Sequence, residues 1–236
     1  MSSGMDAFSA YLESYRTNMK DWPSGRINPF ITISRQAGAG GITITREISR
    51  IFNEDRKHVF PCTWTSFDKD LIKVVMDKYN LSEEVAKYLQ ETTRPQLQDI
   101  LEEIFGVHPS TVGLVRNTSQ TLIQLAQMGY ATLVGRGANV LTRNLKGGFH
   151  VRLIGSLKKR IQHLAEYLTV DPKEAEQIIK KDDEGRRKYL DHYFSKKIDD
   201  PLIYDLVINT DKIPYLEAAQ LIAERILARH KTKSYL

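Results

Sequence analysis

The chain has 236 residues, 41% of them hydrophobic, which suffices for one large domain or two small ones with an ordinary globular core. Lysines and arginines number 34 against 29 aspartates and glutamates, and a net charge of +5 suits nucleic acid, anionic lipid or a polyphosphate ligand without deciding among them. No apolar run approaches the roughly 20 residues that cross a bilayer, and the N-terminus lacks a cationic start followed by an apolar core, so we expect a cytoplasmic protein.

The N-terminal segment predicts a helix over residues 5–20, because Phe8, Leu12 and Tyr15 recur at helical spacing. Residues 21–25 (DWPSG) break this pattern with proline and glycine. We therefore expect a helix and connector over 1–28, a single domain over 29–230 and a short tail over 231–236. The N-terminal helix is the expected contact for any protein partner.

A strand followed by a glycine-rich turn and a helix is predicted at Ile31–Thr45, "ITISRQAGAGGITIT". Such a turn aims backbone N–H groups and the positive end of the helix dipole at one point, which suits a phosphate. The alternative is a plain strand-to-helix turn.

This segment lacks the lysine of the standard phosphate-loop pattern, G-x-x-x-x-G-K-[ST]. In that alignment Gly40 holds the last glycine position, Gly41 the lysine position and Arg35 the first glycine position. The positive charge must then come from elsewhere, and Arg35 is the local candidate. Its plainer role is that of a surface arginine.

Four further strands are predicted at 62–67, 130–134, 149–154 and 204–209, separated by helical stretches. Strands that alternate with helices predict an α/β fold with a parallel sheet and helices on both faces. We expect a helical insertion over about 68–128, whose last helix carries an apolar stripe and ends at Gly129. The lone cysteine, Cys62, is interpreted as a buried thiol.

Two polar residues follow strands at the edge where ligands bind in open parallel sheets. Arg136 lies between two glycines directly after strand 130–134, and either contacts an anion or forms a salt bridge to a helix carboxylate. Asp68 follows strand 62–67, and either caps the next helix or contacts an acceptor substrate.

The two helices near 156–195 have strong start signals, with Ser156 and Asp171 as N-caps. The first has an apolar face that we expect to be buried, made of Leu157, Ile161, Leu164 and Leu168. In the second, Asp182 with Arg186 and Asp183 with Arg187 are i, i+4 pairs, which favours a solvated, internally paired surface. The alternative is a mobile lid whose arginines close on a polyphosphate.

Five blocks occur in the same order in the cytidylate kinase-like family, a branch of the P-loop nucleoside monophosphate kinases. They are "ITISRQAGAGG", "FDKDLI", "LVGRGANVL", "DDEGRRKYL" and "YDLVINTDKI". The chain resembles this family from about residue 29 to 228. The resemblance implies a three-layer P-loop kinase fold with a five-stranded parallel sheet, an acceptor-binding helical insertion and a helical lid over about 156–195.

The resemblance also implies transfer of a phosphoryl group from ATP, with Mg²⁺, to a nucleoside monophosphate. The implied catalytic residues are Arg35, Arg136, Arg160, Arg186 and Arg187. The implied ATP-binding residues are Ser34, Arg35, Gly38, Ala39, Gly40, Gly41, Ile42 and Thr43, with Thr43 also at Mg²⁺. Asp68 and Arg136 would contact the acceptor.

Two functions follow from these observations. The leading hypothesis is a nucleotide kinase acting on a CMP- or dCMP-like acceptor, with Arg35 or a lid arginine in place of the lysine. The second is a weak or inactive kinase that senses a nucleotide and signals to a protein partner. Binding to nucleic acid is the last of the hypotheses, because the basic residues lack interleaved aromatic side chains. No membrane partner is expected.

Overall fold

The computed structural model describes residues 4–19, 27–55, 59–68, 70, 72 and 113–232. These residues contain a five-stranded sheet in the order β2-β3-β1-β4-β5, and every neighbouring pair is parallel. The strands are β1 (Phe30–Arg35), β2 (Thr65–Phe67), β3 (Ala131–Val134), β4 (Gly148–Ile154) and β5 (Leu206–Asn209). The predicted five-stranded parallel sheet is confirmed.

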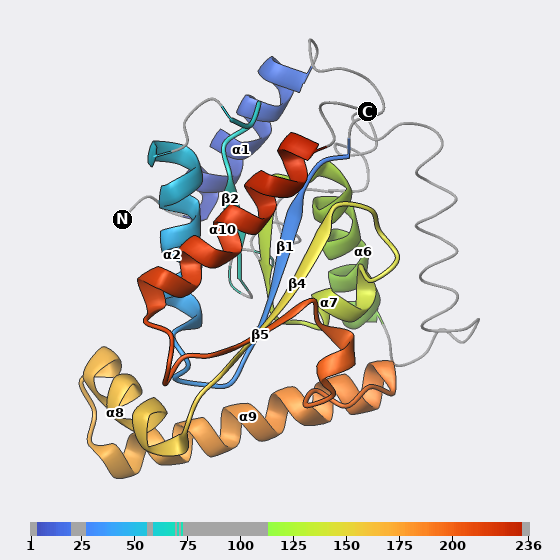
Figure 1. Ribbon diagram of the computed structural model, residues 1–236. Helices are drawn as coiled ribbons and strands as arrows, with labels where there is room; N and C mark the ends of the chain where they lie inside the picture. Colours follow the sequence, from blue (N-terminus) through green and yellow to red (C-terminus); the bar gives the residue numbers. More distant parts are fainter. Residues whose placement is uncertain are drawn as a thin grey trace.

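Helices cover both faces of the sheet, which gives three layers (Figure 1). On one face α2 (Gly41–Arg50), continued by the π-helical turn η2 (Ile51–Asp55), packs against α10 (Tyr215–Thr232). On the other face α6 (Gly113–Met128) contacts α7 (Ala138–Leu141). Four successive residues of the central strand β1 are buried, and this requires cover on both faces.

Two helices, which we call the lid, cross the carboxyl ends of the strands (Figure 1). They are α8 (Leu157–Leu168) and α9 (Pro172–Phe194), and the short η3 (Pro201–Ile203) follows them. Both predicted N-caps are confirmed, because the side chains of Ser156 and Asp171 accept hydrogen bonds from backbone N–H groups of the first turns.

The buried face predicted for α8 is wrong. Leu157 and Leu168 are 40% and 43% exposed, whereas Arg160 is the buried residue of the helix. The reason is that α8 packs on α9 and on the loop after β1 rather than on the sheet. Its apolar side chains therefore lack a sheet surface to cover.

The N-terminal helix α1 (Gly4–Asn18) belongs to the same core as the sheet. Phe8, Tyr11 and Tyr15 are buried, and the ring of Tyr11 meets that of Phe67 on β2 edge to face, with 5.4 Å between centroids. The Tyr11 hydroxyl also donates a hydrogen bond to the carbonyl oxygen of Gly129 at 2.7 Å. This aromatic face covers strand β2 and is not available to a protein partner.

Two smaller expectations concern Cys62 and the membrane. Cys62 is buried, as predicted, and burial raises the pKa of its thiol to about 12.

Across the described ranges, no helix combines the length and the apolar character that a bilayer crossing needs. The predicted connector at 21–25, residues 73–112 of the helical insertion and residues 233–236 of the tail lie outside the described residues.

Candidate functional site

The glycine loop between β1 and α2 has the geometry of an anion-binding turn. Gly38 and Gly40 have φ values of 77° and 76°, in the left-handed region that favours glycine. A Cβ at Gly38 would lie 2.5 Å from the Arg160 carbonyl oxygen, and one at Gly40 would lie 2.4 Å from the Tyr215 ring. Among the described residues no side chain caps α2, so the N–H groups of its first turn are available to an anion.

The side chain of Arg35 extends from the end of β1 across this loop. A Cβ at Gly41 would lie 3.1 Å from Cγ of Arg35, and a Cβ at Gly135 would lie 2.4 Å from its Nη1. The stem of the arginine therefore rests on Gly41, and its guanidinium lies over the turn that follows β3. Arg35 forms no ion pair within the part of the chain that the structure describes.

Arg35 carries its charge into a crowded, cationic environment. Burial lowers the pKa of Arg35 to about 10, and the nearby charges of Arg186 and Arg136 act in the same direction. The charges of Asp68 and Asp182 oppose this shift. The guanidinium is still protonated at neutral pH, so several cations face one another here and an anionic ligand would relieve their repulsion.

Arg136 lies in a turn of three successive left-handed residues, Gly135, Arg136 and Gly137, with φ values of 81°, 56° and 72°. Its side chain is exposed, and its Cζ lies 5.8 Å from the centroid of the Tyr189 ring on α9. Among the described residues it has no carboxylate partner, so the salt bridge that the sequence left open is not seen there.

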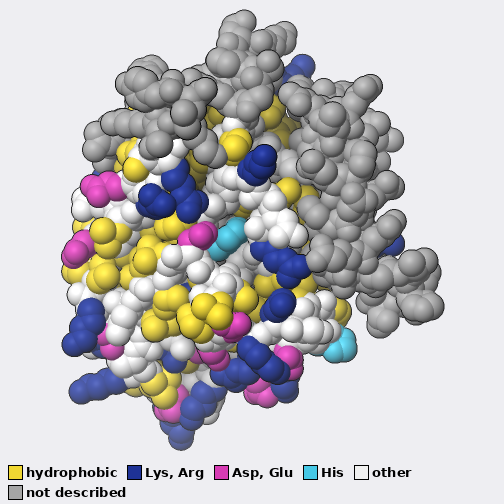
Figure 2. Space-filling model, turned by 45° about the vertical axis from the view of Figure 1, so that its right-hand side comes forward, with side chains coloured by type: hydrophobic (Ala, Val, Ile, Leu, Met, Phe, Trp, Pro, Cys, Tyr) yellow, Lys and Arg dark blue, Asp and Glu magenta, His cyan; other side chains and the backbone are white. Residues whose placement is uncertain are grey.

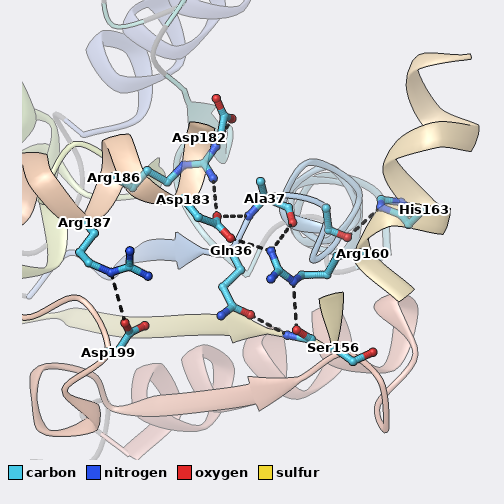
Figure 3. Close-up of polar contacts among 12 residues, drawn as sticks. Gln36, Ala37, Ser156, Arg160, His163, Asp182, Asp183, Arg186, Arg187 and Asp199 are labelled. Carbon is cyan, nitrogen blue, oxygen red and sulfur yellow. Dashed lines mark hydrogen bonds and ion pairs between the residues drawn. The ribbon is translucent and has the colours of Figure 1, made fainter. Parts of the chain in front are cut away.

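Asp183 on α9 joins the lid to the glycine loop (Figure 3). One carboxylate oxygen accepts the backbone N–H of Ala37 at 2.7 Å, and the other accepts Nη1 of Arg160 at 2.7 Å. Arg160 in turn donates to the carbonyl oxygens of Ala37 and Gly155, both at 3.0 Å. We call Asp183 and Arg160 the latch.

The lid arginines point in different directions. Arg186 donates to Asp182 at 2.7 Å and to Asp183 at 3.3 Å, whereas Arg187 points away, its Nε 3.8 Å from Asp199. The predicted pair of Asp182 with Arg186 is confirmed. The pair of Asp183 with Arg187 is wrong, because Asp183 turns inward to the loop.

The outer surface of α9 is nonetheless a paired helical surface, as expected. Lys180 with Glu176 and Lys188 with Glu184 are both 2.7 Å apart. Dark blue and magenta side chains lie side by side along the lower edge of the face in Figure 2, where α9 runs. These exposed ion pairs form a surface of α9 that faces solvent, and they contribute little to the stability of the fold.

A cavity of ≈ 720 Å³ lies between the glycine loop, the turn after β3 and the lid. Most of the predicted site residues line it: Ser34, Arg35, Gly38, Gly40, Gly41, Ile42, Thr43, Arg136 and Arg186. The others do not: Ala39 is buried in the core, Arg160 is in the latch, Arg187 points away, and Asp68 accepts the backbone N–H of Asp70. That last contact is a local capping interaction.

Sequence reasoning missed several residues that line the cavity. His163 lies with Nδ1 3.0 Å from the carbonyl oxygen of Gly38, and α9 contributes Lys181, Gly185 and Tyr189. The last three are spaced four residues apart and so share one helical face. That spacing was a usable signal, but the surrounding charge pairs favoured a solvated surface.

Comparisons with known proteins give one family match and several similar solved structures. The sequence model of the cytidylate kinase-like family matches residues 30–212. An uncharacterized protein from Eubacterium ventriosum has a similar structure, with TM-score 0.55 and 19% identity, covering 84% of this chain and 98% of that one. A shikimate kinase from Acinetobacter baumannii, solved with shikimate, has TM-score 0.45 and 15% identity, covering 86% of this chain and 94% of that one. No curated protein matches the chain.

Proposed function

The chain belongs to the cytidylate kinase-like family, and on that premise we propose that it transfers the terminal phosphoryl group of ATP to a nucleoside monophosphate. In the proposed reaction the bond from the terminal phosphorus to the bridging oxygen of ATP breaks. A phosphate oxygen of the acceptor, which is CMP- or dCMP-like, forms the new bond to that phosphorus, and ADP leaves. Arg35 takes the place of the lysine that the loop lacks.

The observation that carries this proposal is the position of Arg35. Its stem rests on Gly41, which holds the lysine position, and its guanidinium lies over Gly135 beside the cavity. A cation therefore lies beside the cavity, close to the loop that lacks the lysine. Arg35, Arg136 and Arg186 all line this cavity, so the charge that phosphoryl transfer requires is concentrated in one place.

The other residues of the cavity hold the phosphate groups in position. The uncapped N-terminus of α2 offers backbone N–H groups to the phosphates of ATP. Arg136 and Arg186 approach from the turn after β3 and from the lid, where they can neutralise charge on the group in transfer. In this class of reaction the protein contributes mainly position and positive charge.

Magnesium fits the residues present. The hydroxyl-bearing Thr43 lines the cavity at the start of α2. The described residues contain no cluster of three or more histidine, cysteine or acidic side chains, and Mg²⁺ bound with nucleotides usually takes few protein ligands beside phosphates and water. Thr43 would hold the ion, which would lower the negative charge of the phosphates.

Calorimetry with Mg-ATP and with each nucleoside monophosphate, joined to a coupled phosphotransfer assay, tests the proposal. We expect binding of Mg-ATP and turnover with at least one pyrimidine monophosphate. Binding without turnover on any acceptor would instead support the second hypothesis, a nucleotide-sensing module. Absence of binding for every nucleotide would contradict both.

A further inference from the structure

Gly185 lies in the middle of the 23-residue helix α9 without a conformational reason to be glycine. Its φ is outside the left-handed region, and the helix runs unbroken through it. Glycine in a helix interior is destabilising relative to alanine, so a glycine there calls for another explanation.

Packing among the described residues does not supply that explanation. Apart from the helix's own nearby backbone, no described atom lies within 4 Å of the position that a Cβ of Gly185 would take. At Gly38, Gly40 and Gly137, by contrast, a Cβ would lie 2.4 to 2.6 Å from a protein atom. Those three glycines avoid a clash with another part of the protein. At Gly185 no described residue would clash with a side chain.

The open space beside Gly185 is part of the cavity. Gly185 lines it together with Lys181 one turn earlier and Tyr189 one turn later, on the same face of α9. The Tyr189 ring has the Arg136 guanidinium 5.8 Å from its centroid. The missing side chain therefore exposes helix backbone between an ammonium group and an aromatic ring.

The size of the cavity suits a whole small-molecule ligand. At ≈ 720 Å³ it falls within the range of about 300–1,000 Å³ that holds whole small-molecule ligands. The phosphates are assigned to the loop, Arg35 and Arg136. The part of the ligand beside Gly185 and Tyr189 is then the flat, less charged part, which suits the ring of Tyr189 and the exposed backbone.

We propose that Gly185 is a specificity-determining residue, and that the sugar and base of a bound nucleotide pack against α9 in the space its missing side chain leaves. This inference rests on the proposed nucleotide-binding function. It assigns to the lid a role in holding the nucleoside, in addition to the charge that Arg186 supplies.

Gly185→Ala and Gly185→Leu test the inference, with Gln177→Ala on the exposed surface of α9 as the control. Because alanine favours the helix, Gly185→Ala should raise Tm by about 2–4 °C. We expect the same variant to weaken the affinity for at least one nucleotide fivefold or more by calorimetry, and Gly185→Leu to weaken it further. Inorganic tripolyphosphate, which has no nucleoside, should bind both variants within twofold of the wild type.

Opposite effects on stability and binding are the signature of a ligand contact. Nucleotide affinities within twofold of the wild type in both variants would overturn the inference and leave the proposed function standing. An equal loss of tripolyphosphate affinity would also overturn it, because it would indicate a general change in the lid. A wild-type protein that binds no nucleotide would contradict the proposed function and this inference together.

Discussion

Arg35 and Gly41 lie against each other at the start of the phosphate loop, so that a Cβ on Gly41 would lie 3.1 Å from Cγ of Arg35. Gly41 is not among the left-handed glycines of the described residues, so its backbone conformation does not demand glycine. The close approach of the arginine stem favours glycine there. The two positions are therefore coupled through space: a side chain at 41 would require the stem of Arg35 to shift.

Arg35→Ala should weaken the affinity for Mg-ATP by about 10–100-fold, because one charge-assisted contact to phosphate is lost. Calorimetry measures this directly. The control is Arg187→Ala, which removes an exposed lid arginine that does not line the cavity. We expect that control to change the affinity by less than about twofold, and equal effects of the two variants would mean that Arg35 does not contact phosphate.

Replacement of Arg136 should lower kcat/KM far more than replacement of Lys188. Arg136→Asn is the suitable variant, since asparagine tolerates the left-handed backbone at this position, where φ is 56°. Lys188→Ala removes a 75% exposed side chain that pairs with Glu184 on the same helix. Steady-state kinetics should show at least about a tenfold difference between them, and small, equal effects would make Arg136 a structural residue.

The latch should stabilise the fold as well as the lid. In Asp183→Asn, Arg160 keeps its charge at 8% exposure but loses its carboxylate partner, so the free energy of unfolding should fall by about 1–3 kcal/mol. The double variant Arg160→Met/Asp183→Leu removes both charges and should recover part of that loss. Urea denaturation measures both variants. Wild-type stability in the single variant would show that the latch contributes nothing.

His150 should make the fold sensitive to mild acid. Burial lowers the pKa of His150 below its ordinary value of 6.5; the charge of Arg229 acts in the same direction and that of Asp205 opposes it. The unfolded chain therefore binds a proton more readily than the fold, and stability is lost as the pH falls below about 6.5. His150→Gln should flatten that part of a pH series of urea denaturations, and an unchanged slope would assign it to other groups.

Local sequence patterns predicted the elements of the fold because those patterns depend on near neighbours. Alternation and helical spacing predicted the five strands and the helices that the structure describes between them, and side-chain oxygens at Ser156 and Asp171 predicted the starts of the lid helices. The glycine loop was recognisable for the same reason, since strand, turn and helix follow one another directly.

Contacts between distant segments were not predictable in this way. Asp183 does not pair with Arg187, its expected partner four residues on, because its carboxylate accepts the backbone N–H of Ala37, 146 positions away. The apolar side chains of α8 suggested a buried face, but the helix packs on the loop and on α9 instead of the sheet. The orientation of α9 over the strand ends also decides which of its residues line the cavity, and no local pattern encodes that orientation.

The coupling of positions 35 and 41 gives the most direct test of the account. Mg-ATP affinity and phosphotransfer rate are measured for Arg35→Ala, for Gly41→Lys and for the double variant. If Arg35 stands in for the lysine, each single variant is impaired, because one lacks the cation and in the other the new side chain crowds the arginine stem. The double variant should then recover most of the affinity and rate, since its lysine occupies the vacated space. A double variant no better than Arg35→Ala, or an Arg35→Ala variant equal to the wild type, would contradict the account.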